Sequence, residues 1–135
     1  MKILILCTGN SCRSQIAEGF FRFYSKGQAE VLSAGIEAHG LNSKAVLVMK
    51  EVGVDISSHQ SKTLDQFIGT SFDYIITVCD HADEHCPYFP GNAKKIHKSF
   101  PDPAKATGTD VEILNQFRNV RNLIQQYSQD FFTFK

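Results

Sequence analysis

The residues best suited to chemistry lie near the amino terminus, where a cysteine and an arginine flank a short polar loop. Cys7 ends an apolar run, and Arg13 opens a segment with helical periodicity. The loop between them is formed by Thr8, Gly9, Asn10, Ser11 and Cys12. In a loop that joins a strand to a helix, successive backbone N–H groups point inward and cradle an anion, and an arginine binds two oxyanion oxygens at once. We therefore predict that this loop and Arg13 bind an oxyanion.

The same environment favours a thiolate at Cys7. A helix N-terminus and a nearby guanidinium both stabilise negative charge on sulfur, so we expect a lowered pKa for Cys7. Ser14 is placed to donate a hydrogen bond to that thiolate. Cys7 is accordingly interpreted as a nucleophile rather than as a buried core cysteine. We expect the Cys12 side chain to be structural and the Asn10 amide to stabilise the loop.

Two further cysteines follow a second apolar strand. Cys79 ends that strand, and Cys86 lies seven residues further on. If the strand neighbours the first one, their ends lie about 5 Å apart, which is within disulfide reach of Cys7. Two alternatives remain open: Cys79 fills the core and Cys86 is incidental, or Cys79, His81, His85 and Cys86 bind zinc, although the cysteine spacing exceeds the usual one. Otherwise the two histidines are expected to be solvated residues of a short helical turn.

Asp102 is a candidate general acid. Pro101 and Pro103 flank it and hold its backbone stiffly outside any helix. A carboxyl group placed rigidly near the anion cradle can protonate a leaving oxygen. The alternative is an ordinary turn aspartate.

Alternating strand and helix patterns position these residues. Strands are expected at residues 2–7, 30–34, 72–78 and 95–100. Helices are expected from Arg13 to Tyr24, at residues 43–52 with Gly53 at the C-terminal cap, and from a capping box of Thr109 and Glu112 to Phe131. This alternation predicts an α/β fold with a parallel sheet, in which the carboxyl ends of the strands share one edge.

Composition narrows the functional class. The 135 residues are 42% hydrophobic, carry 14 basic and 14 acidic residues, and show no repeat or linker, so we expect a single domain over residues 1–135. A net charge of zero gives no general attraction to nucleic acid or membranes. Only four consecutive apolar residues precede Cys7, too few for a signal peptide or a membrane span. We expect a cytoplasmic monomer, in which disulfides are transient and catalytic.

The loop and the segments around it resemble the thioredoxin-coupled arsenate reductases, which share the fold of the low-molecular-weight protein tyrosine phosphatases. The similarity begins with Cys-Thr-Gly-Asn-Ser-Cys-Arg-Ser-Gln at residues 7–15 and continues at residues 33–40, 51–57, 77–79 and 101–104. It implies a four-stranded parallel sheet flanked by helices. It also implies arsenate as substrate, thioredoxin as external reductant, and neither a bound cofactor nor a metal.

By this resemblance the cysteines form a relay. Cys7 attacks arsenate while Asp102 protonates the departing oxygen. Cys79 then attacks Cys7, and Cys86 attacks Cys79 and carries the disulfide to the surface, where thioredoxin reduces it. The phosphatases typically have an aromatic residue where this chain has Ala104, a departure that favours a small inorganic substrate.

Two other functions remain open at this point. The loop is common to both branches of the family, so the chain is alternatively a low-molecular-weight phosphatase with a protective cysteine. A third interpretation is a non-enzymatic module that binds oxyanions or metals. The sequence leaves open whether thioredoxin or glutaredoxin is the physiological reductant.

One residue departs from the reductases that bind potassium beside the loop. Asn10, Glu18 and Ser33 match three oxygen ligands of that ion, but Lys62 stands where the family has an aspartate. An ammonium group donates no ligand oxygen and repels a cation. We expect Lys62 to occupy the potassium position and to pair with Glu18.

Overall fold

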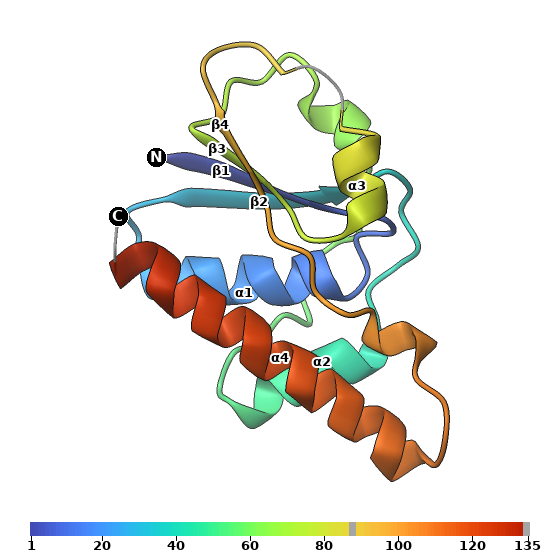
Figure 1. Cartoon of the computed structure of the whole chain (residues 1–135). Helices are drawn as coiled ribbons and strands as arrows, with labels where there is room; N and C mark the ends of the chain where they lie inside the picture. The colour runs from blue at the N-terminus through green and yellow to red at the C-terminus, as the bar shows by residue number, and fades with distance from the viewer. Residues whose placement is uncertain (87–88, 134–135) are drawn as a thin grey trace.

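The four strands form one parallel sheet, as predicted. The computed structural model describes residues 1–86 and 89–133, apart from the side chain of His81. The strands are β1 (Lys2–Cys7), β2 (Glu30–Gly35), β3 (Tyr74–Thr77) and β4 (Lys94–His97), in the order β2-β1-β3-β4. β1 is therefore central, and its carboxyl end lies between those of β2 and β3 (Figure 1).

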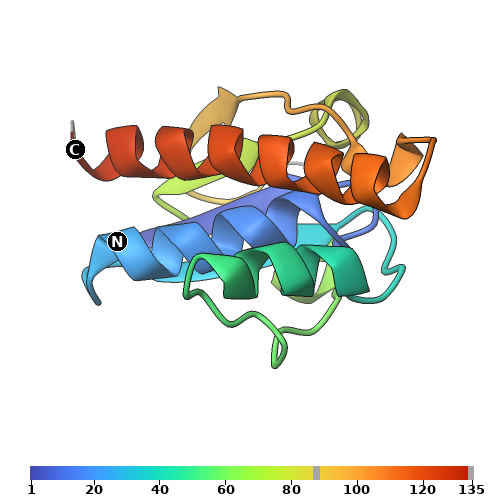
Figure 2. The same ribbon diagram turned by 90° about the horizontal axis from the view of Figure 1, so that it is seen from below.

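Helices cover both faces of this sheet unequally. The larger ones are α1 (Arg13–Ser25), α2 (Ser43–Glu51) and α4 (Asp110–Thr133). They lie side by side on one face (Figure 2), whereas the short α3 (Asp80–Glu84) lies on the other (Figure 1). Two 3-10 turns, Leu64–Phe67 and Pro103–Lys105, complete the fold. In the part of the chain that the structure describes, no helix has both the length and the apolar character to cross a membrane.

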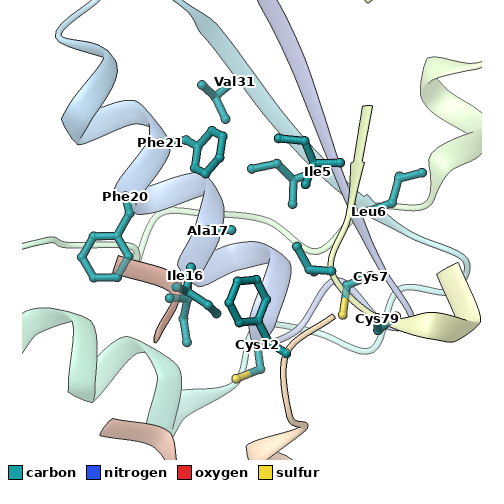
Figure 3. Close-up of a cluster of buried hydrophobic side chains, with 14 of the residues drawn as sticks. Ile5, Leu6, Cys7, Cys12, Ile16, Ala17, Phe20, Phe21, Val31 and Cys79 are labelled. Atoms are coloured by element: carbon teal, nitrogen blue, oxygen red, sulfur yellow. The ribbon is translucent and has the colours of Figure 1, made fainter. Parts of the chain in front are cut away.

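The core explains the sequence pattern of β1 and α1. Both faces of β1 are covered, so its consecutive side chains from Ile3 to Leu6 are fully buried. Phe20 and Phe21 of α1 pack into the same core (Figure 3). The rigid strand and helix fix the two ends of the loop between Cys7 and Arg13.

Element boundaries differ from the sequence predictions by one to three residues. The last two strands end at Thr77 and His97, before the predicted residues 78 and 100. Val78 still donates to the Leu6 carbonyl and accepts from the Phe100 N–H, so isolated backbone bonds continue beyond both strand ends. α2 ends at Glu51, and Gly53 follows with φ +81. The capping box is confirmed: Thr109 and Glu112 exchange hydrogen bonds of 3.2 Å before α4.

Candidate active site

The loop after β1 is held from outside through its carbonyl groups. Backbone N–H groups of residues 36–42 donate hydrogen bonds of 2.9–3.2 Å to the carbonyl oxygens of Cys7, Thr8, Gly9 and Ser11. Ser61 Oγ donates a further one to the Gly9 carbonyl at 3.0 Å. Because these carbonyls are occupied on the outer side, the loop is suited to present N–H groups inward as an anion cradle.

Asn10 holds the centre of the loop, as its predicted role requires. Its backbone is left-handed, with φ 47, a conformation that asparagine tolerates. The buried side-chain amide donates to Ser14 Oγ at 2.8 Å and to Ser33 Oγ at 2.9 Å. The side-chain oxygen Oδ1 of Asn10 accepts a hydrogen bond from the Lys62 backbone N–H at 2.8 Å. The Asn10 side chain is thus committed to the protein, and only its backbone remains available to a ligand.

Cys7 and Cys79 meet at the carboxyl ends of neighbouring strands. β1 and β3 pair from Ile3↔Tyr74 to Leu6↔Thr77, which brings the following residues together. The Cys7 thiol hydrogen-bonds to the Cys79 sulfur, and Thr8 Oγ1 lies 3.1 Å from the same sulfur. Figure 3 shows the two sulfur-bearing residues together, with Cys12 apart from them at the start of α1.

The proton distribution in this pair differs from the prediction. The hydrogen bond to Cys79, together with burial, raises the pKa of Cys7, although Arg13 acts in the opposite direction. Hydrogen bonds from Cys7, from Thr8 and from the Ala82 backbone lower the pKa of Cys79 to about 5. The prediction of a lowered pKa at Cys7 is therefore wrong for this conformation. Because the two thiols share a hydrogen bond, they titrate as a pair rather than as separate groups.

Arg13 and Asp102 face the same cavity. Arg13 Nη1 donates to the Phe100 carbonyl at 3.1 Å, and Nη2 lies 3.5 Å from Asp102 Oδ2. Asp102 also caps the following 3-10 turn through a 3.0 Å bond from the Ala104 N–H. The cavity has a volume of about 320 Å³. Its lining residues are Cys7, Thr8, Gly9, Ser11, Cys12, Arg13, His39, Asp102, Ala104 and Lys105.

The structure also describes the surroundings of Cys12 and Ser14. Burial raises the pKa of Cys12 to about 12, so its thiol is unreactive, as expected for a structural side chain. Ser14 is fully buried and its Oγ accepts the Asn10 amide. Its hydrogen bond to the Cys7 thiolate stays a prediction.

Sequence reasoning missed three contributors to the site. Thr8 was assigned to the loop for its backbone, yet its hydroxyl stabilises Cys79. At Gly35, a Cβ atom would approach the Thr8 carbonyl oxygen to 2.8 Å, so only glycine lets β2 lie this close to the loop. His39 lies against Gly9 in the lining of the same cavity, where a Cβ atom at Gly9 would clash with its ring. The position of Gly35 directly after an apolar strand was the only available signal.

Cys86 lies beyond α3, on the other face of the sheet from α1. It is half-buried, and burial raises the pKa of its thiol. The short helical turn predicted around the two histidines is α3, and His85 is exposed. Among the described residues, no group of three or more His, Cys, Asp or Glu side chains is arranged to hold a metal ion. The His81 side chain lies outside the described residues, so the zinc alternative stays untested.

The surroundings of Lys62 differ from the expectation. Its ammonium group donates to the Gln60 carbonyl at 2.7 Å. The buried Glu18 carboxylate pairs instead with Arg22 at 3.0 Å and with His59 at 3.5 Å, and it accepts a hydrogen bond from Ser33. Burial lowers the pKa of Lys62, and Glu18 partly offsets this effect through space. The expected ion pair between Lys62 and Glu18 is therefore not formed, and the two groups interact only through space.

We predict that exchanging sodium for potassium changes neither activity nor melting temperature. The positive charges near Glu18 come from the chain itself, and the Lys62 ammonium repels a further cation. Lys62→Asp should introduce a potassium response, whereas Lys94→Asp on the exposed edge strand should not. Thermal melts and rate measurements in the two salts test this. Clear potassium activation of the unmodified protein would contradict this prediction and show that Lys62 does not stand at the position of the potassium-binding aspartate.

The parallel sheet, the loop between Cys7 and Arg13, and Asp102 in the same cavity define a class of α/β proteins. Within that class, the chain belongs to the low molecular weight phosphotyrosine protein phosphatase family, whose model matches residues 2–134.

Its relatives include reductases and phosphatases. An arsenate reductase from Halalkalibacterium halodurans is 52% identical over 122 residues, covering 90% of this chain and 88% of that protein. A solved arsenate reductase in the phosphate binding state has a TM-score of 0.79 at 29% identity, covering 98% of this chain and 96% of that one. A low molecular weight protein tyrosine phosphatase from T. tengcongensis has a TM-score of 0.80 at 27% identity, covering 100% and 99%.

Proposed function

We propose that this chain reduces arsenate to arsenite with electrons supplied by its own thiols. The observation that carries the proposal is the hydrogen bond between Cys79 and Cys7, the cysteine that lines the cavity beside Arg13 and Asp102. A phosphatase needs one nucleophilic cysteine, whereas a reductase needs a second sulfur that can reach the first. The 52% identity to a protein named arsenate reductase supports the same function.

The first step is formation of a thiol–arsenate adduct. The loop N–H groups and Arg13 bind the oxyanion, and the Cys7 proton moves to Cys79 along their hydrogen bond. Cys7 Sγ then forms a bond to arsenic, and one arsenic–oxygen bond breaks. Asp102, at the mouth of the same cavity, gives its proton to the departing oxygen.

The second step moves two electrons to arsenic. Cys79 gives the proton it received to an oxygen of the arsenate adduct and is again a thiolate. It then attacks Cys7 Sγ, and a sulfur–sulfur bond forms as the sulfur–arsenic bond breaks. The electron pair of the broken bond stays on arsenic, which leaves as arsenite. Hydrogen bonds from Thr8 and from the Ala82 backbone N–H lower the pKa of Cys79 and so favour this thiolate.

The third step regenerates Cys7. Cys86 attacks Cys79, the Cys7 thiolate leaves, and a Cys79–Cys86 disulfide remains. An external dithiol, which we take to be thioredoxin in a cytoplasmic setting, reduces this disulfide. No bound cofactor is needed, and a monomer suffices because every group comes from one chain.

This third step requires α3 to unwind. α3 fills most of the interval between Cys79 and Cys86, and seven residues of helix span roughly 10 Å. A disulfide needs Cα atoms about 4.4–6.8 Å apart. The helix therefore holds the two cysteines apart in the reduced protein.

We predict that residues 80–88, of which 87 and 88 lie outside the described residues, lose hydrogen-exchange protection on oxidation. The loss should be confined to this segment, because α1 and the sheet keep their core contacts. Exchange measured by mass spectrometry on the reduced and oxidised forms tests this. Equal, strong protection in both forms would contradict a moving Cys86.

Phosphate ester cleavage is the second candidate activity, and the shared loop favours it. Cys7, Arg13 and Asp102 are the groups that such a reaction needs, and the T. tengcongensis phosphatase has the same fold. Ala104 presents only a methyl group to the cavity, so an aromatic ester gains little from packing there. We propose phosphatase activity as a weak side reaction.

The two activities are separated by one paired assay. Arsenite production coupled to thioredoxin is measured beside hydrolysis of p-nitrophenyl phosphate under the same conditions. We expect sustained arsenite production and slow ester cleavage. Efficient ester cleavage without arsenite production would assign the chain to the phosphatases.

A further inference from the structure

His97, the last residue of β4, ties α3 to the sheet. Its Nε2 lies 2.8 Å from Asp80 Oδ1 in the first turn of α3, and its Nδ1 lies 2.8 Å from Thr77 Oγ1 on β3. Thr77 Oγ1 also lies 3.4 Å from Asp83 Oδ1, one turn further along α3. Two neighbouring strands thus hold both acidic side chains that α3 turns toward the sheet.

The hydrogen-bond partners fix the roles of the two ring nitrogens. A carboxylate only accepts hydrogen bonds, so Nε2 of His97 carries the proton that it donates to Asp80. Nδ1 lies on the Thr77 hydroxyl, whose single proton is shared between this ring nitrogen and the Asp83 carboxylate. The side chains of His97 and Asp80 are 33% and 76% exposed, so this contact lies at the protein surface.

The same residues surround the last cysteine of the relay. A cavity of about 240 Å³ lies between α3 and the sheet, and Cys86, Thr77, Asp83 and His97 all line it. The contacts that hold α3 down are therefore beside the thiol that must move. Thr77 and His97 are paired in the β3–β4 register, so the sheet holds these two residues in place independently of α3.

We propose that His97 is a positioning residue that holds α3 in its reduced, helical form and so sets the equilibrium of the Cys79–Cys86 disulfide. This inference rests on the proposed relay. The His97–Asp80 contact exists only while Asp80 is placed by the helix, so it stabilises the dithiol and not the disulfide. Oxidation forms the sulfur–sulfur bond and releases two protons and two electrons to an external disulfide, and it also breaks this contact.

The test is a reduction potential. Cys7→Ser is used as the parent so that Cys79 pairs with Cys86, and the protein is equilibrated with oxidised and reduced dithiothreitol. Mass spectrometry of the alkylated protein gives the disulfide fraction. His97→Ala should favour the disulfide about threefold to tenfold, the range that one lost hydrogen bond supplies. A tenfold change is about 30 mV more negative for this two-electron couple.

Four further variants isolate the contact. Asp80→Ala should shift the potential in the same direction, and the double variant His97→Ala/Asp80→Ala should shift it by less than the sum of the single changes. Glu84→Gln, which removes an exposed acidic charge from the same helix, should leave it unchanged. His97→Gln keeps a donor in reach of Asp80 and should recover part of the loss.

The outcomes separate this inference from the relay itself. A disulfide that forms in the parent with a potential indifferent to His97→Ala would overturn the positioning role and leave the relay standing. Additive shifts from His97 and Asp80 would also overturn it, because the two residues would then act apart. If the parent forms no Cys79–Cys86 disulfide, the relay fails and the role of His97 fails with it.

Discussion

Serine in place of Cys86 is expected to abolish multiple-turnover arsenate reduction and to leave phosphate ester cleavage intact. Without the third thiol, the Cys7–Cys79 disulfide cannot be moved away from the buried end of β1, where both sulfurs are almost inaccessible. Cys79→Ser should have the same effect, because it removes the sulfur that attacks the adduct. Steady-state arsenite production with thioredoxin, beside p-nitrophenyl phosphate hydrolysis, measures both activities.

Cys7→Ser is the matched comparison. Both reactions use this sulfur as the nucleophile, so both should be lost together. Normal cycling of the Cys86→Ser variant with thioredoxin would show that an external thiol reaches the first disulfide directly, and the relay proposed here would be wrong.

Asp102→Asn is expected to slow the chemical step by about 10²–10⁴-fold, the usual contribution of a general acid. The amide keeps an oxygen that can accept the Ala104 N–H, so the turn should persist. Oxyanion binding should change little, because the loop N–H groups and Arg13 remain. A single-turnover rate and a phosphate-binding titration separate the two effects.

Asp110→Asn, an exposed carboxylate at the start of α4, is the control for the loss of one negative charge. It should leave the rate unchanged. A normal single-turnover rate for Asp102→Asn would reduce Asp102 to a residue that shapes the turn.

Local patterns were sufficient to predict most of the scaffold. The apolar run before Cys7 is buried on both sides as a central strand, and the capping box at Thr109 opens α4 as expected. These features depend on neighbouring residues in the chain, so the sequence displays them directly. The predicted strand boundaries were less accurate, because the ends of β3 and β4 depend on backbone hydrogen bonds between segments that are distant in the sequence.

Features that depend on distant contacts were not predictable in the same way. The pKa of Cys7 was expected to be lowered by its own loop, but the neighbouring Cys79 takes up the negative charge. That outcome depends on β3 lying beside β1 and on the Thr8 hydroxyl pointing across. Likewise, Lys62 was expected to pair with Glu18, but in the fold the Glu18 carboxylate forms its ion pair with Arg22.

The central claim, that two electrons pass from Cys7 and Cys79 to arsenic, is tested most directly with the Cys86→Ser variant in a single turnover. The reduced protein is mixed with excess arsenate in the absence of any other reductant, and arsenite and thiols are quantified together. The account predicts arsenite in an amount equal to the protein and a Cys7–Cys79 disulfide in the peptide map. Arsenite formed while Cys79 remains a free thiol, or no arsenite at all, would contradict it.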